Sequence, residues 1–174
     1  MVETERLVIV PLNYDQLRLY LKGNGKLEKE LQLTTGARNV SDEVKESVEF
    51  FILPSMKNTV GDHYLFYTFW LIVEKASRRI VGESGFKGPP NDKGEIEIGY
   101  GIFSHERRKG LMTEAIGGMV EWAKKRADVN YILAEADENN LASIRVLQKN
   151  NFDIFDKKEK MLWWKTEVIS RPVL

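Results

Sequence analysis

Apolar and polar positions divide the chain into short stretches that are typical of strands and helices. Residues 6–12 ("RLVIVPL") are rich in β-branched side chains and predict a first strand that stops at a proline. Two aromatic and β-branched runs, 63–75 and 79–88, are joined by a short polar turn and predict a hairpin. Residues 95–103 ("EIEIGYGIF") alternate with period two and predict a strand with one apolar face. That face contains Ile96, Ile98, Tyr100 and Ile102.

Helical spacing occurs in three places. Residues 14–56 have a helical pattern that is interrupted by several glycines. Within 113–127, apolar residues recur at intervals of three and four, and two adjacent glycines indicate close packing. A third helix is predicted over 139–151, between a strand at 130–137 and a pair of strands over 152–168. The buried edge of this third helix is predicted to hold Leu141, Ile144, Leu147 and Gln148.

The order of these elements is β, helices, β, β, β, α, β, α, β, β, which predicts an α/β (α+β) protein. We expect a mixed, mostly antiparallel central sheet with flanking helices and one strand-helix-strand crossover in its centre. A chain of 174 residues is long enough for a substantial core and short for two ordinary domains. We therefore predict a single domain over residues 1–174.

Composition narrows the range of functions. The formal net charge is zero, with 43% hydrophobic and 30% charged residues, which argues against a nucleic-acid or membrane partner. The absence of cysteine excludes disulfides, thiolate zinc sites and a thiol nucleophile. The two histidines are far apart, which argues against a histidine-rich metal site; a carboxylate site is the open alternative, and no metal is expected. The first residues lack the basic region of a signal peptide and no apolar run approaches about 18 residues. We expect a cytoplasmic protein.

The sequence "ERRKGLMTEA" (106–115) combines three cations, a glycine and the start of a helical segment. A strand that ends in such a loop presents unpaired backbone N–H groups at the positive end of the following helix, which is a place that binds phosphate. The spacing matches neither the nucleotide triphosphate loop nor the dinucleotide fingerprint. A basic, solvated turn without a ligand is the alternative interpretation.

Three stretches in order, "EIEIGYGI", "ERRKGLMTEAI" and "AEADENNLASIRVLQKNNF", resemble the strand, pyrophosphate loop and following segment of the GNAT superfamily of N-acetyltransferases. Within it the chain resembles the branch of the ribosomal-protein-alanine acetyltransferases, which carries R-x-K-G-x-A-T-E-A and N-x-x-S-I-x-V-L-x-x-x-G-F. The resemblance covers roughly residues 4–168 and implies the acyl-CoA N-acyltransferase (GNAT) fold. Two positions depart from it. Met112 replaces a small residue in the loop, and Asn151 replaces a glycine at a helix end, where asparagine tolerates the left-handed conformation.

The resemblance implies acetyl-coenzyme A as cosubstrate and assigns residues to it. The pyrophosphate would be wrapped, chiefly through backbone N–H groups, by Arg107, Arg108, Lys109, Gly110, Leu111, Met112 and Thr113. The backbone of Ile102 and Phe103 would pair with the pantetheine arm. Asn140 would contact the pantetheine amides, and it is also placed to cap the last helix; one residue can do both.

Acetyl transfer to an amine needs a base, because an alkyl amine with a pKa of about 10.4 is mostly protonated at neutral pH. Glu135 is the first candidate, since related enzymes carry a glutamate five residues before the asparagine; Glu97 and Glu83 are the others. Solvent-facing strand positions are the alternative for each. Ser143 matches the serine of the family motif and would donate to the departing sulfur, or else bond back to its own helix. Leu147 stands where many members have a tyrosine.

The sequence thus predicts an N-acetyltransferase that moves an acetyl group from acetyl-coenzyme A to a primary amine by direct attack. The acceptor is a small molecule or a protein N-terminus, and the possibility of a homodimer is left open. A non-catalytic acyl-coenzyme A binding module is the alternative from another class, and a nucleotide binder is a further one. Binding with no turnover on any amine would favour the module.

Overall fold

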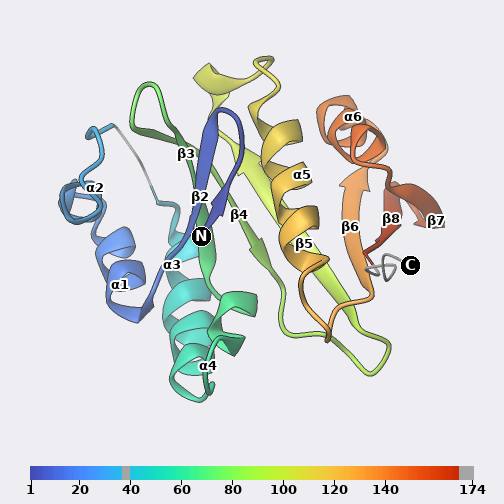
Figure 1. The fold of residues 1–174 in the computed structure, drawn as a ribbon, viewed down its shortest axis with the longest axis horizontal. Helices are drawn as coiled ribbons and strands as arrows, with labels where there is room; N and C mark the ends of the chain where they lie inside the picture. Colours follow the sequence, from blue (N-terminus) through green and yellow to red (C-terminus); the bar gives the residue numbers. More distant parts are fainter. Residues whose placement is uncertain (37–39, 169–174) are drawn as a thin grey trace.

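The computed structural model describes residues 1–36 and 40–168, so positions 37–39 of the predicted helical stretch lie outside the described residues. Within them the chain forms one eight-stranded sheet with the order β1-β2-β3-β4-β5-β6-β8-β7 (Figure 1). The strands are β1 Val2–Glu3, β2 Leu7–Pro11, β3 Phe69–Glu74, β4 Arg79–Phe86, β5 Glu95–Ile102, β6 Tyr131–Asp137, β7 Asp153–Lys158 and β8 Met161–Glu167.

The sheet is mixed and mostly antiparallel, as predicted. Only β5 and β6 pair in parallel among the described strands, and helix α5 (Leu111–Ala123) connects them as the predicted crossover. A parallel pair needs such a long connection, because its strands run in the same direction and the chain must return to the end of the sheet at which the first strand began.

The remaining helices fall into two groups. The stretch before β3 forms α1 (Tyr14–Lys22), α2 (Lys26–Glu30), α3 (Asp42–Ser47), the π-helical turn η1 (Val48–Ile52), α4 (Leu53–Lys57) and the 3₁₀ turn η2 (His63–Phe66). The 3₁₀ turn η3 (Ser104–Glu106) follows β5, and α6 (Leu141–Lys149) follows β6. Figure 1 shows α1–α4 grouped near β2 and β3, apart from α5 and α6.

Two predictions of local structure are wrong and have physical explanations. Residues 63–66 form a 3₁₀ turn instead of a strand, because Phe66 inserts into the core against Phe86 and Trp122, with ring centroids 5.9 and 5.8 Å away. On α6, Leu141 is 59% exposed and Gln148 is exposed, because the helix packs through Leu147 and leaves its flanks in solvent.

Alternate residues of the sheet supply two apolar cores. On β3, Trp70 and Ile72 join the core under α5, whereas Leu71 and Val73 join the core under α1–α4, because successive strand side chains point to opposite faces. The glycine pair in α5 permits close approach as predicted: a Cβ at Gly118 would lie 2.8 Å from Thr4 Cγ2. The sheet therefore separates the two helix groups, and its two faces carry different parts of the candidate site.

Candidate functional site

Strands β5 and β6 stop pairing halfway along their length. Their register runs only from Glu95 opposite Tyr131 to Glu97 opposite Leu133. Beyond that point β5 continues against β4, and β6 continues against β8 as far as Asp137. We call the region between residues 98–102 and 134–137 the β5/β6 split. Because parallel strands share their carboxyl ends, the helices α5 and α6 that follow them both begin at the open end of this split.

The backbone of β5 presents unused hydrogen-bonding groups to the split. Lys87 N–H donates to the Glu97 carbonyl over 2.9 Å, and Phe103 N–H donates to the Val81 carbonyl over 3.0 Å, so odd-numbered residues bond towards β4. Backbone groups alternate in direction along a strand. Those of Tyr100 and Ile102 therefore face the split, where an extended ligand can pair with them.

Phe103 does not fit its predicted backbone role. Its N–H is held by Val81, and its carbonyl accepts from Glu106 N–H over 2.9 Å in the turn η3. Both polar groups of its backbone are thus used within the fold. The predicted pairing from Ile102 agrees with the direction of the strand, and Tyr100 is the second position of the same kind.

The loop before α5 ends in a left-handed glycine. Gly110 is the N-cap residue with φ 76°, and no side chain caps the helix. The N–H groups of Leu111, Met112 and Thr113 have no carbonyl in the preceding turn of helix to receive them. They form a donor cluster at the positive end of α5, which suits an anion.

The side chains of the first helical turn point away from this donor cluster. Leu111 is 1% exposed and Met112 is 5% exposed, and both belong to the core under α5. The bulk of Met112, the departure from the family pattern, is therefore accommodated in the core. Its backbone N–H alone contributes to the loop, and a small side chain is not required for a ligand to approach.

The three cations of the loop differ in their partners. Lys109 Nζ donates to Glu106 Oε2 over 2.6 Å, and this hydrogen bond raises the pKa of Lys109 above its ordinary value. Arg107 and Arg108 are exposed and form no ion pair with any residue that the structure describes. The charge of Lys109 is thus offset by Glu106, and the two arginines supply the positive field at the loop.

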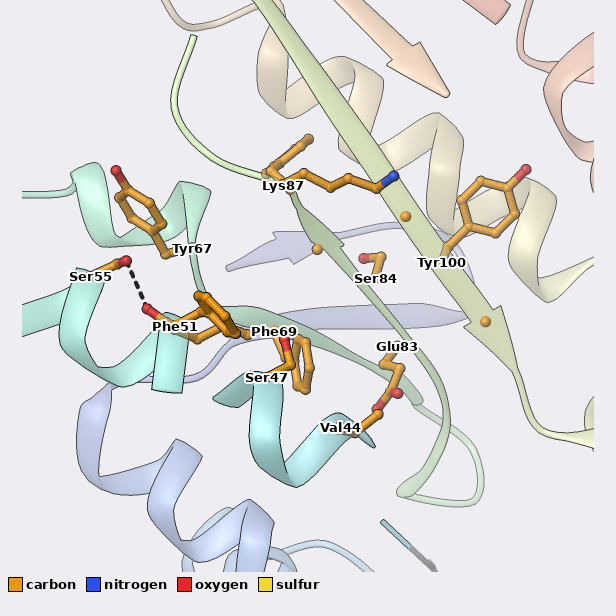
Figure 2. A pocket seen from close by; sticks show the side chains of 15 residues that line it. Val44, Ser47, Phe51, Ser55, Tyr67, Phe69, Glu83, Ser84, Lys87 and Tyr100 are labelled. Atoms are coloured by element: carbon orange, nitrogen blue, oxygen red, sulfur yellow. Dashed lines mark hydrogen bonds between the residues drawn. The ribbon is translucent and has the colours of Figure 1, made fainter. Parts of the chain in front are cut away.

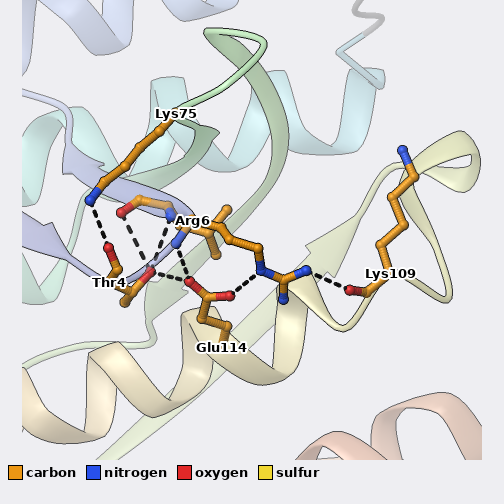
Figure 3. A network of polar contacts seen from close by, with 6 residues as sticks. Thr4, Arg6, Lys75, Lys109 and Glu114 are labelled. Carbon is orange, nitrogen blue, oxygen red and sulfur yellow. Dashed lines mark hydrogen bonds and ion pairs between the residues drawn. The ribbon is translucent and has the colours of Figure 1, made fainter.

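A polar network fixes the loop to the sheet edge (Figure 3). The Arg6 guanidinium donates to the Lys109 carbonyl over 2.9 Å and to Glu114 Oε2 over 2.7 Å. Thr4 Oγ1 and Arg6 N–H both donate to Glu114 Oε1, over 2.6 and 2.7 Å. Burial alone would raise the pKa of Glu114, but these hydrogen bonds outweigh it and hold the pKa below its ordinary value. The loop backbone is therefore held from outside the loop.

On the face of the sheet opposite α5, two of the predicted glutamates come together. Lys87 Nζ lies 2.7 Å from Glu135 Oε1 and also makes an ion pair with Glu97. Partial burial alone would lower the pKa of Lys87, but the hydrogen bonds to both glutamates raise it overall. Glu135 is 35% exposed, so it is no buried carboxyl. The structure places a cation between two carboxylates beside the split, and the sequence did not single out that cation.

The third predicted glutamate lines a cavity of about 620 Å³ between the α3–α4 segment and strands β4 and β5 (Figure 2). Glu83 Oε2 accepts a hydrogen bond of 2.8 Å from Tyr20 Oη. Lys87 also lines this cavity, which places the cavity next to the Glu97 and Glu135 carboxylates. We call this space the acceptor-side cavity.

The start of α6 supplies polar groups from the other side of the split. Asn140 Oδ1 accepts from Ser143 N–H over 3.1 Å, so the predicted N-cap is present and the Asn140 amide N–H₂ is left for other partners. Ser143 Oγ lies 2.8 Å from Tyr100 Oη, rather than bonding back to its helix. Burial raises the pKa of Tyr100, and the hydrogen bond with Ser143 offsets only part of that rise.

Tyr100 is a candidate site residue that sequence reasoning missed. The sequence placed it on the apolar face of β5 and directed the search for a tyrosine donor to α6, where Leu147 is fully buried. The pairing with Ser143 joins residues 43 positions apart, which no local pattern reveals. The signal available was a single hydroxyl among the apolar side chains of that strand face.

None of the helices in the described part of the chain is long and apolar enough to cross a membrane. No group of three or more histidine, aspartate or glutamate side chains among the described residues is arranged to hold a metal ion.

The chain is similar to known proteins over most of its length. The family described as "Acetyltransferase (GNAT) domain" matches residues 6–153. An uncharacterized N-acetyltransferase, YjdG of Bacillus subtilis (strain 168), is 31% identical over 94% of this chain and 96% of its own.

Solved structures share the fold at low identity. A ribosomal L7/L12 α-N-protein acetyltransferase in complex with coenzyme A has a TM-score of 0.64 at 14% identity, over 94% of this chain and 95% of its own. The enzyme AAC(6')-Ib in complex with ribostamycin and coenzyme A has a TM-score of 0.64 at 16% identity, over 94% of both chains. The family match and the relative above 30% identity decide the assignment: the chain belongs to the GNAT acetyltransferase family, as an N-acetyltransferase.

Proposed function

We propose that this chain transfers the acetyl group of acetyl-coenzyme A to a primary amine that enters from the acceptor-side cavity. The observation that carries the proposal is the left-handed turn at Gly110, which leaves the α5 N-terminus uncapped at the open end of the β5/β6 split. A phosphate-bearing acetyl donor suits one side of the split, and an amine suits the cavity on the other side. Two structures with the same fold, named above, contain coenzyme A.

The residues present fit coenzyme A. The N–H groups of 111–113 would receive the pyrophosphate, with Arg107 and Arg108 adding positive charge near the outer phosphate. The β5 backbone at Tyr100 and Ile102 would pair with the pantetheine amides, since it faces the split. The Asn140 amide would donate from the opposite side while its oxygen keeps the α6 cap. Acetyl-coenzyme A would supply an activated thioester carbonyl for attack.

The amine must lose a proton to attack. We assign this proton to Glu135, acting directly or through a water, because its carboxylate lies next to the split and is held by Lys87. Glu97 shares the same lysine and is the second candidate. The neutral amine nitrogen then forms a bond to the thioester carbonyl carbon, the carbon–sulfur bond breaks as coenzyme A leaves, and the nitrogen releases its second proton to solvent to give the amide. No covalent intermediate with the enzyme is required.

The departing thiolate takes up a proton. Ser143 is positioned to donate, and the Tyr100 hydroxyl at 2.8 Å can restore the proton on Ser143. A thiol with a pKa of about 8.5 is a tolerable leaving group, so this donation assists the reaction without being indispensable. The Tyr100–Ser143 pair therefore has a smaller expected effect on rate than the glutamates.

The proposal is tested by measuring coenzyme A release from acetyl-coenzyme A with a panel of primary amines, beside calorimetric binding of acetyl-coenzyme A. We expect binding in both the presence and absence of amine, and thiol release that depends on the amine. Binding without release on any amine would favour a non-catalytic module. Stronger thermal stabilisation by ATP than by acetyl-coenzyme A would exclude the cofactor assignment.

A further inference from the structure

The floor of the acceptor-side cavity is made of glycines. Gly85 on β4 and Gly99 on β5 are partners in the strand register, and Gly101 is the next residue on the same face of β5. A Cβ built at Gly99 or at Gly101 would meet nothing within 4 Å, so the protein's own packing does not require glycine there. At Gly82, by contrast, a Cβ would lie 2.5 Å from the Gly101 carbonyl oxygen. The two floor glycines of β5 leave a flat, open surface for a ligand.

The walls of the cavity are mainly apolar and aromatic. The helical segment contributes Val44, Phe51 and Ile52, and the chain around the start of β3 contributes Tyr67 and Phe69. Phe51 is 71% exposed, although it belongs to the wall. Figure 2 shows the side chains of Phe51, Tyr67 and Phe69 on the opposite side of the cavity from β5. The wide π-helical turn η1 places Phe51 and Ile52 on this wall together, and such turns recur at functional sites.

Charge in the cavity is limited. Among the lining residues of this cavity only Glu83 and Lys87 are charged. Lys87 is committed to Glu97 and Glu135, so this cluster of three carries one net negative charge, and Glu83 carries another. A ligand with three or more ammonium groups would bring more positive charge into the cavity than these two negative charges compensate, and an uncompensated charge held against an apolar wall is costly. A ligand with one ammonium group and an apolar body has no such cost.

The size of the cavity suits a small molecule. A volume of about 620 Å³ falls within the 300–1,000 Å³ that is typical of small-ligand pockets. We infer that the acceptor is a small primary amine with a single positive charge on a flat apolar body, which lies on the Gly99 and Gly101 floor against the aromatic wall. This inference rests on the proposed acetyl transfer and adds the chemical class of the acceptor.

The first experiment compares acceptors on the wild-type protein. Values of kcat/KM are measured with 2-phenylethylamine, with the polycations spermidine and kanamycin, and with a tetrapeptide that begins with alanine. We expect 2-phenylethylamine to exceed each of the others by at least about tenfold, since one misplaced buried charge costs that much or more. Preference for a polycation or for the peptide would overturn the inferred class and leave acetyl transfer standing. Transfer to none of the four, while other amines of the wider panel still give thiol release, would overturn the inferred class alone.

The second experiment adds a side chain to the glycine floor of the cavity. A Cβ at Gly99 meets no atom within 4 Å, so Gly99→Val adds a side chain above the strand at a position with open space, and β-branched residues suit strands. We expect its KM for 2-phenylethylamine to rise about tenfold, as overpacking of a filled site does, and Gly99→Ala to give a smaller rise. The melting temperature and the Kd for acetyl-coenzyme A should stay close to wild type. An unchanged KM for 2-phenylethylamine in Gly99→Val would overturn the inference.

Discussion

Arg6 donates a hydrogen bond of 2.9 Å to the backbone carbonyl of Lys109, and so a residue beside the first strands holds a loop more than a hundred positions away. The bond fixes the direction of that carbonyl, and with it the peptide that precedes Gly110. The same guanidinium holds Glu114 in the first turns of α5. The donor cluster at the α5 N-terminus is thus organised before a ligand arrives, which lowers the entropic cost of binding.

Arg6→Ala should weaken acetyl-coenzyme A binding indirectly, through the loop that Arg6 holds. Loss of the bonds to the Lys109 carbonyl and to Glu114 frees the loop, and we expect Kd to rise about tenfold, the equivalent of one or two hydrogen bonds. Calorimetric titration measures the change. Arg6→Lys, which keeps the charge but not the fork, is the control and should recover only part of the affinity. An unchanged Kd in Arg6→Ala would show that the loop holds its shape unaided.

Glu114 should make stability depend on pH at the acidic end. Its pKa in the folded protein lies below the ordinary value of 4.5, so its contribution is complete above pH 4.5 and is lost as pH falls through the lowered folded-state pKa. The free energy of unfolding of Glu114→Gln should therefore be lower than wild type by about 1 kcal/mol at neutral pH. Denaturant titrations should show that difference shrinking below pH 4.5. A difference that is constant with pH would contradict the role of the ionised carboxylate.

Gly110→Asp should abolish acetyl-coenzyme A binding. A side chain at φ 76° is strained, and a carboxylate at the helix N-terminus would meet the pyrophosphate with like charge. Gly110→Ala introduces the strain without the charge and should raise Kd by roughly tenfold, in line with a cost of 1–2 kcal/mol for the left-handed conformation. Comparing the two variants separates backbone shape from electrostatics. An unchanged affinity of Gly110→Asp for acetyl-coenzyme A would show that the pyrophosphate does not bind at this loop.

The sequence predicts those parts of the site that depend on local patterns. The period-two face of β5, the helical face of α5 and the glycine before that helix all follow from residues close together in the chain. Asn151, predicted to replace a glycine in the left-handed conformation at a helix end, has φ 59° as expected.

Contacts between distant segments could not be predicted from those local patterns. Lys87 follows a strand and precedes a loop, and nothing near it indicates that two glutamates on other strands meet it. The acceptor-side cavity arises where β4 and β5 meet the α3–α4 segment, so its glycine floor has meaning only in three dimensions. The aromatic run at 63–66 has strand composition, but burial of Phe66 overrides that preference.

Lys87→Met should shift the pH dependence of acetyl transfer. The lysine lies between Glu97 and Glu135, and its raised pKa keeps it charged through the neutral range. Without that cation the two neighbouring carboxylates disfavour one another's ionisation, so one of them holds a proton to higher pH. We expect the acidic limb of the kcat/KM profile to move to higher pH. Lys87→Arg should leave the acidic limb at its wild-type pH. An acidic limb that stays at the same pH in Lys87→Met would show that the base lies outside the cluster of Lys87, Glu97 and Glu135.

Glu135→Gln and Glu97→Gln distinguish the two candidate bases. The variant that lacks the base should have a kcat about 10²–10⁴-fold below wild type, which is the usual contribution of general base catalysis, while its Kd for acetyl-coenzyme A stays near wild type. The other variant should change the rate modestly through the shared Lys87. Steady-state rates beside calorimetry give both quantities. Equal, small effects in the two variants would move the base to Glu83, which faces the same cavity with Tyr20 as its donor.

Tyr100→Phe tests the proton path to the departing thiolate. Burial raises the pKa of Tyr100, so its hydroxyl remains protonated well into the alkaline range and can restore a proton to Ser143 at 2.8 Å. Because a coenzyme A thiolate leaves readily, we expect kcat to fall only about three- to tenfold in Tyr100→Phe and by a similar factor in Ser143→Ala. The double variant should be no slower than either single one, since the two groups act in series. Rates that multiply in the double variant would instead assign them independent roles, with Ser143 drawing its proton from water.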